Sequence, residues 1–223
     1  MAVLDLSPIW TPAGQRRRRP SATPDFEHLL GPVAWNSLPG TVRDRFCSAS
    51  HARPVVYRGE MVVRASPAGW LFAQVCRLIG TPLAPWRGEA VPVRVDVHLD
   101  RRGGLAWDRT YDFPGRRPVM VSSSKLMSPG GSLMEVVRGG LGMTLAVSVE
   151  DAALHFRSLA YFLQLGFVRL PLPMLASPGR AHVIHTDEGG GTFRFTLIFT
   201  HPLLGETLFQ DGLFKDPPEG VLP

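Results

Sequence analysis

The chain of 223 residues is poor in cysteine and has no long apolar run. Cys47 and Cys76 are the only cysteines, too few and too far apart for a disulfide framework or a thiolate zinc site. We expect both to be reduced, buried thiols in a cytoplasmic protein. The longest uncharged apolar stretches, 139–149 and 158–168, reach about half of the roughly 20 residues of a membrane-spanning helix. We therefore expect no transmembrane segment, and the first residues fit no secretory or twin-arginine signal.

Lysine is almost absent, at Lys125 and Lys215 only, so arginine supplies most of the cations. The isoelectric point near 9.9 suggests nucleic-acid binding at first, but Arg16–Arg19 account for most of the net charge of +5. We predict that residues 1–24 are a disordered Arg/Pro-rich tail, that 25–216 form one β-rich domain, and that 217–223 are flexible. The domain is then nearly neutral, and we expect no nucleic-acid partner. The run Arg16–Arg19 is either a solvated tail or a functional basic arm.

Helical patterns occur only in the first third of the chain, at 24–31, 35–49 and 66–80, where Ser66 is the expected N-cap of the third. From Val91 onward apolar and polar residues alternate, with turns such as "RRGG", "SPGG" and "GGG" between the alternating segments. The pattern predicts an α+β, mainly antiparallel β protein: a curled or barrel-like sheet of about ten strands with two or three N-terminal helices. Closure removes exposed strand edges, and such a lipocalin-like sheet can enclose a small ligand.

The stretch "GGLAWDRTYDF" predicts a strand that places an arginine among aromatic residues. With a period of two, Arg109 shares the buried face with Trp107 and Tyr111. A buried guanidinium needs an anion, so Arg109 is either a structural residue paired with a carboxylate or the anchor of a ligand. The proposed carboxylate is Glu60, on a strand whose inward face we take as Val56, Arg58, Glu60 and Val62. The second candidate is Asp211.

The other motifs give little indication of a catalytic, metal or cofactor site. In "HVIH" the imidazoles of His182 and His185 point to opposite faces of a strand, so we expect no shared metal. The glycine-rich stretches are not followed by a helix, no Gly-x-Ser-x-Gly elbow is present, and we expect no cofactor. The hairpin 193–214 places His201 and Glu206 beside one turn, either in a local hydrogen bond or as an acid/base pair at a cavity mouth.

Four segments carry a resemblance to a known family: "WDRTYDF", "GGLGMTLAVSVED", "YFLQLGFVRLPLP" and "RFTLIFTHPLLGETLFQDGLF". In this order they resemble the domain of unknown function 4166, over about Phe26 to Phe214. The resemblance implies larger relatives in which this domain follows a saccharopine-dehydrogenase-like domain. It implies no catalytic residues.

Three functions remain open. The first is a carrier of a small apolar or anionic, lipid-like molecule, since ligand pockets are mostly apolar with a few convergent polar groups. The second is an enzyme that uses the same cavity, and the third is an accessory domain with a dehydrogenase-like protein partner. The candidate site residues are Arg109, Trp107, Tyr111, Glu60, His201, Glu206 and Asp211.

Overall fold

The computed structural model describes residues 23–47, 53–78, 83–166 and 168–217. Most of the predicted tail and of the predicted flexible C-terminus lies outside these residues. The described helices are α1 (Phe26–Ser37), α2 (Gly40–Phe46), α3 (Pro67–Leu78) and a short 3-10 helix, η2 (Met174–Ala176). The strands are β1 (Val55–Ala65), β2 (Gly88–Leu99), β3 (Leu105–Tyr111), β4 (Val119–Met127), β5 (Leu133–Val137), β6 (Leu141–Glu150), β7 (Ala153–Leu165), β8 (Val168–Leu172), β9 (Arg180–Gly189), β10 (Thr192–His201) and β11 (Gly205–Lys215).

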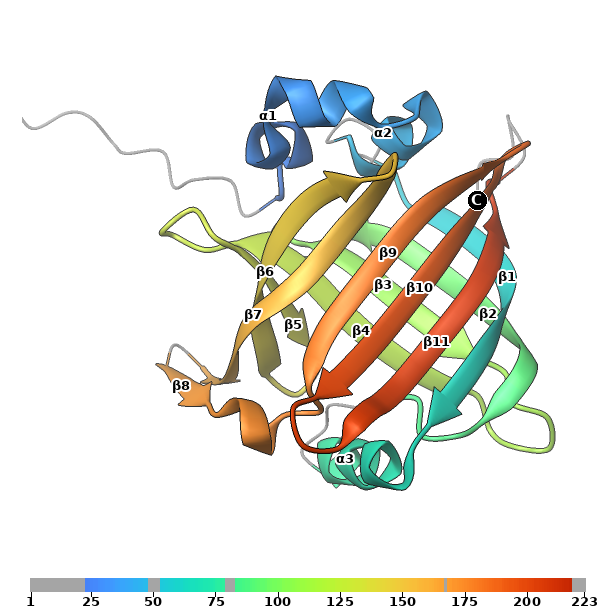
Figure 1. Ribbon diagram of the computed structural model, residues 1–223, viewed down its shortest axis with the longest axis vertical. Helices are drawn as coiled ribbons and strands as arrows, with labels where there is room; N and C mark the ends of the chain where they lie inside the picture. Colours follow the sequence, from blue (N-terminus) through green and yellow to red (C-terminus); the bar gives the residue numbers. More distant parts are fainter. Residues whose placement is uncertain (1–22, 48–52, 79–82, 167, 218–223) are drawn as a thin grey trace, which may run out of the picture.

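The described strands form a closed antiparallel barrel. Their order is β6-β5-β4-β3-β2-β1-β11-β10-β9-β7-β8, and β6 also pairs with β7. The pairing of β6 with β7 closes a ring of ten strands, and β8 hangs on β7 as an extra strand (Figure 1). The predicted fold class is confirmed, including the choice of strand over helix for the segment that forms β7.

Local sequence signals explain the closure. The two-residue turn between β6 and β7 has positive φ at Asp151 and Ala152, 49° and 59°, as a tight hairpin turn requires. The first and last strands, β1 and β11, meet at Gly59, where a Cβ would lie 2.0 Å from the carbonyl oxygen of Leu213. A glycine at this seam therefore lets the two backbones approach closely.

Helices lie at both ends of the barrel: α1 and α2 at one end and α3 at the other (Figure 1). The side chain of Asp25 caps α1 by accepting a hydrogen bond from the backbone N–H of His28 at 3.0 Å. The pattern predicted over 35–49 is divided, because Pro39 disfavours helical geometry at the residue before it and α2 begins only at Gly40. Leu38 and Phe46 are nevertheless both buried against the barrel end.

The opposite end is covered by α3, which packs on β11. Ser66 caps this helix as predicted, since its Oγ accepts a hydrogen bond from the N–H of Gly69 at 3.1 Å. Gly69 permits the close packing, because a Cβ there would lie 1.8 Å from the carbonyl oxygen of Thr207. The buried face of α3 includes Cys76, as predicted for a buried thiol. The same prediction was wrong for Cys47, which follows the end of α2 and is only half-buried, packed against the core with part of its surface exposed.

The orientation predicted for β1 was wrong by one residue. Tyr57, Met61 and Val63 are buried, whereas Arg58 and Glu60 are exposed on the outer wall. The odd-numbered and the even-numbered residues of β1 both include apolar side chains. The alternation alone therefore did not show which of the two sets faces the interior. A shift of one residue turns every side chain to the other face.

Candidate functional site

The interior of the barrel contains Arg109, on the inward face of β3 as predicted. Its Nη1 donates a hydrogen bond to Ser123 Oγ at 3.3 Å. The guanidinium lies 5.3 Å from the ring centre of Phe195 and 5.9 Å from that of Trp107. Of the ion pairs among the described residues, none joins Arg109 directly to a carboxylate. Aromatic rings and a hydroxyl therefore surround this cation.

The nearest buried carboxylate belongs to Glu135 on β5, which stands directly opposite Lys125 on β4. Lys125 Nζ and Glu135 Oε2 are 3.1 Å apart, and the two side chains are only 4% and 6% exposed. Ser123 links this pair to Arg109, because its Oγ donates to Glu135 Oε1 at 2.6 Å. We call Arg109, Ser123, Lys125 and Glu135 the buried charge cluster.

The buried charge cluster has two basic side chains and one carboxylate. Burial lowers the pKa of Lys125, and the positive charge of Arg109 adds to that effect while Glu135 opposes it. Burial alone would raise the pKa of Glu135, but the charges of Lys125 and Arg109 hold it below its usual value. Glu135 is therefore ionised at neutral pH. One carboxylate balances only one of the two basic side chains, and a second positive charge without a partner is costly inside a protein.

A second polar contact lies farther along β3. Tyr111 donates its phenolic hydrogen to Gln210 Oε1 on β11 at 2.8 Å, across the interior. Burial raises the pKa of Tyr111, so the phenol stays neutral. Tyr111 thus fixes the two walls of the barrel relative to each other with a satisfied hydrogen bond.

A small cavity adjoins the buried charge cluster beneath α2. Its volume is about 10 Å³, near the minimum that one water molecule needs. Its walls are Phe46, Trp107, Arg109, Lys125, Phe156, Val183, His185 and Phe195. Two buried nitrogens from these walls, Trp107 Nε1 and His185 Nε2, have no hydrogen-bond partner among the described residues. Burial, reinforced by the charge of Arg45, lowers the pKa of His185 to about 3, so its imidazole is neutral.

The cavity is closed on one side by the last residues of α2. Phe46 forms part of the cavity wall. The preceding residue, Arg45, lies at the same end of the barrel. Arg45 Nε donates to Asp216 at 2.8 Å, its Nη1 lies 3.3 Å from Asp187, and its guanidinium lies 4.6 Å from the ring centre of Phe193. The ion pairs of Arg45 with Asp187 and Asp216 therefore hold α2 over the cavity.

The structure brings only three of the predicted site residues together: Trp107, Arg109 and Tyr111. Glu60 is exposed on the outer wall, and Asp211 faces outward too, where Arg194 Nη1 donates to it at 2.7 Å. Neither carboxylate is the partner that we predicted for Arg109. The error arose because β1 is turned by one residue and because Asp211 lies between Gln210 and Gly212, which are both buried.

His201 and Glu206 lie at the other end of the barrel. Glu206 is exposed, whereas His201 is buried, and its Nδ1 accepts a hydrogen bond from the N–H of Leu203 at 3.2 Å. The turn is thus held by a local hydrogen bond, but to the backbone and not to Glu206. In "HVIH", His185 is buried and His182 faces outward, as predicted. The described part of the chain holds no group of three or more His, Cys, Asp or Glu side chains suited to a metal ion.

The sequence-based prediction missed Ser123, Lys125 and Glu135. The alternation in "VMVSSSKLM" contained the signal, because Val121, Ser123 and Lys125 share one face of β4. The serines hid it, since they look equally suited to a solvent-exposed face. Glu135 gave no comparable signal, because its strand has only five residues.

A comparison with protein families identifies the chain: the model described as "Domain of unknown function (DUF4166)" matches residues 38–214. The chain belongs to the DUF4166 family. The match spans every strand of this DUF4166 domain except part of β11, whose last residue is Lys215. No curated protein and no solved structure matches the chain. The association with saccharopine-dehydrogenase-like domains stays a prediction. Of the described helices, none is both long enough and apolar enough to span a membrane.

Proposed function

We propose that this DUF4166 domain binds a small apolar molecule with an acidic group inside its barrel, with the acidic group held by Arg109 and Lys125. The observation that carries the proposal is the excess of basic side chains in the buried charge cluster. Arg109 and Lys125 share the single carboxylate of Glu135, and all three side chains are buried. A ligand anion would balance the second positive charge when Lys125 is protonated, and a hydrogen bond between charged groups contributes about 1.5–3 kcal/mol.

The walls around the cations suit an apolar or aromatic ligand body. Phe46, Phe156 and Phe195 supply rings, and Trp107 adds an indole N–H that lacks a partner. A buried donor without a partner costs about 1–3 kcal/mol, so an acceptor on the ligand would remove that penalty. Apolar walls with a few convergent donors are typical of small-molecule sites.

A ligand larger than one water needs more room than the cavity of about 10 Å³ provides. The side chain that can yield space is Phe46, since it belongs to α2 and not to the barrel wall. Entry of a ligand therefore requires α2 to move away from the barrel end that it covers. This movement breaks the contacts of Arg45 with Asp187 and Asp216. The structure then corresponds to the closed state of a carrier with a movable cap.

An enzymatic function in the same cavity is a weaker alternative to ligand binding. The titratable side chains of the predicted site besides Arg109 and Tyr111 do not line the interior cavity; they are Glu60, His201, Glu206 and Asp211. Lys125 and Glu135 are the titratable pair beside it, and together they already form an ion pair. An accessory role beside a dehydrogenase-like protein would leave the excess charge inside the barrel unexplained.

The test uses two fluorescent probes of similar shape, the anion anilinonaphthalene sulfonate and the neutral phenylnaphthylamine. We expect the wild-type chain to bind the anion more tightly. Arg109→Met should weaken binding of the anion about tenfold to a hundredfold, because one charged hydrogen bond is lost, and should leave the neutral probe unaffected. Leu213→Ser, an exposed position on the barrel wall outside the cavity, is the control. Equal affinity of wild type and Arg109→Met for the anion would refute the proposal. Native mass spectrometry of the purified protein would identify a co-purifying acid.

A further inference from the structure

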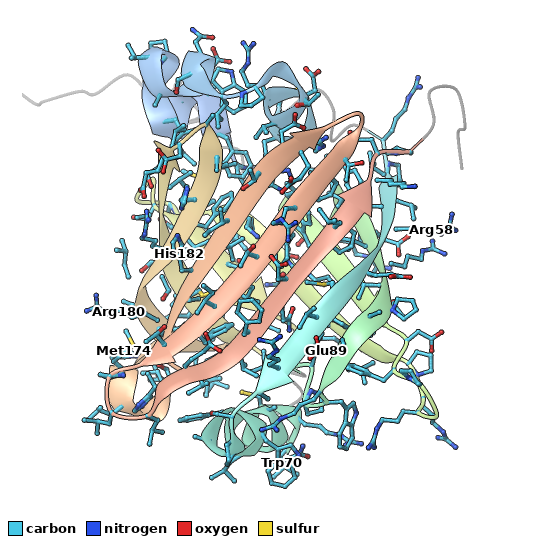
Figure 2. All side chains as sticks on the ribbon, turned by 45° about the vertical axis from the view of Figure 1, so that its right-hand side comes forward. Arg58, Trp70, Glu89, Met174, Arg180 and His182 are labelled. Atoms are coloured by element: carbon cyan, nitrogen blue, oxygen red, sulfur yellow. The ribbon has the colours of Figure 1, made fainter. Side chains whose placement is uncertain are left out.

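The barrel end that carries α3 exposes an unusual number of large apolar side chains. We call them the apolar rim; they are Trp70, Leu71, Val75, Leu78, Leu175, Leu203 and Leu204. Leu78 is 87% exposed and Leu203 is 75% exposed. Figure 2 shows Trp70 pointing away from the barrel at this end. A soluble protein seldom leaves so many apolar side chains together in water, so such a patch marks an interaction surface.

Helix α3 contributes most of the rim and is apolar on both sides. Gly69, Ala73 and Cys76 face the barrel and are buried. The opposite side carries Trp70 and Leu71, together with the other two α3 members of the rim. A helix on a protein surface normally turns polar residues outward. The outward side of α3 therefore has the composition of a contact surface.

The rim is one surface because His201 joins the three elements that form it. The imidazole lies 5.8 Å, between ring centres, from Phe72 on α3. Its Nε2 lies 3.3 Å from the carbonyl oxygen of Leu175 in η2, and its Nδ1 accepts from the N–H of Leu203 in the β10–β11 turn. These contacts hold α3, η2 and the turn side by side at the same end of the barrel (Figure 1).

A positively charged hollow adjoins the rim. It has a volume of about 550 Å³, and its charged lining residues are Arg77, at the end of α3, and Arg116 and Arg117, in the loop between β3 and β4. No acidic side chain of the described residues lines it. The guanidinium of Arg116 stacks 3.8 Å from the ring centre of Trp86. We call these three arginines the rim arginines; all are exposed.

We infer that this end of the barrel docks on a lipid bilayer that contains anionic lipids. The apolar rim enters the boundary between headgroups and acyl chains, with α3 lying in the plane of the interface. The rim arginines bind the headgroup phosphates. Exposed apolar residues, a tryptophan and neighbouring cations are the combination found in interfacial helices.

A bilayer fits these observations better than a protein partner. The apolar side chains are exposed on three elements, and none of them lines the pockets described in this structure. The rim arginines line a hollow that has no acidic side chain among the described residues, which suits a dense field of phosphates. This inference does not depend on ligand binding in the barrel, because the rim is at the opposite end from the α2 cap.

The experiment is co-sedimentation of the full chain with phosphatidylcholine vesicles, with and without phosphatidylserine. We expect binding to the vesicles that contain phosphatidylserine, weakened by high salt. Trp70→Ser should reduce it at least tenfold. Arg116→Gln with Arg117→Gln should remove the preference for phosphatidylserine. Leu213→Ser, an exposed apolar residue on the barrel wall, is the matched control and should change nothing. A thermal melt of each variant verifies that it is folded.

The basic run Arg16–Arg19 requires its own control, since it could attract anionic vesicles by itself. A variant with glutamine at all four positions should still bind in a manner that depends on Trp70. Binding that depends on these four arginines and not on Trp70 would overturn the inference. Failure of the wild-type chain to bind vesicles would also overturn it. If that chain instead self-associates through Trp70, the apolar rim is an interface between copies, and the inference is likewise overturned.

Discussion

Arg109 and Glu135 are connected through one hydroxyl group: Ser123 Oγ accepts a hydrogen bond from Arg109 Nη1 and donates one to Glu135 Oε1. The carboxylate makes its direct ion pair with Lys125 instead. This relationship bears on the two roles that the sequence left open for Arg109. Among the described residues Arg109 has no direct ion pair with a carboxylate, which supports the proposed role as a ligand anchor.

Glu135 is expected to be the most sensitive residue of the cluster. Among the described residues Glu135 is the only buried carboxylate beside Lys125 and Arg109, so Glu135→Gln should lower the free energy of unfolding by about 3–5 kcal/mol. Urea denaturation followed by circular dichroism measures this change. Glu60→Gln on the exposed outer wall is the control, with an expected change within about 0.5 kcal/mol. Similar small losses in both variants would contradict an ionised Glu135 in the interior.

Arg109 and Lys125 should differ in their effect on stability. Arg109→Met keeps most of the side-chain volume and leaves the Lys125–Glu135 pair intact, so we expect a loss of only about 1 kcal/mol. Lys125→Met removes the direct partner of Glu135 and should cost about 3–5 kcal/mol. The same denaturation experiment compares the two. A larger loss for Arg109→Met than for Lys125→Met would make Arg109 the main structural partner of Glu135.

His185 should make the protein less stable in mild acid. Its pKa is lowered from 6.5 to about 3 in the folded state, so the unfolded chain binds more protons between these values. The free energy of unfolding therefore falls as the pH drops below 6.5, by at most about 1.4 kcal/mol per pH unit from this group.

His185→Phe keeps the ring packing against Phe46 and Phe193 and should remove this contribution. His28→Gln, at an exposed position, should retain the wild-type pH dependence. Urea denaturation at several pH values below neutrality tests both variants. An unchanged slope in His185→Phe would show that His185 is not the group responsible.

The two cysteines should react at different rates. Burial raises the pKa of Cys76 to about 11, so its thiol is both protonated and inaccessible. Cys47 is half-buried and should react faster. Because the chain has only two cysteines, Cys47→Ser and Cys76→Ser each leave one thiol for labelling with Ellman's reagent. Rapid labelling of Cys76 in the native protein would indicate that α3 opens readily.

The sequence by itself determined the fold class and the burial of Arg109. Alternation with a period of two, interrupted by glycine-rich turns, depends only on neighbouring residues, which is why the antiparallel strands and the inward face of β3 were predictable. The same holds for Ser66 as a helix cap, because an N-cap is a local hydrogen bond.

Only the tertiary structure decided which groups meet inside the barrel. β1 carries apolar residues in both alternate sets, so the choice of Tyr57 over Glu60 for the interior depended on packing against distant strands. Lys125 and Glu135 face each other because β4 and β5 pair in one particular register, and Trp107 and His185 line one cavity because β3 and β9 belong to opposite parts of the closed ring. Such contacts between distant residues follow from barrel closure, which no local pattern of the sequence specifies.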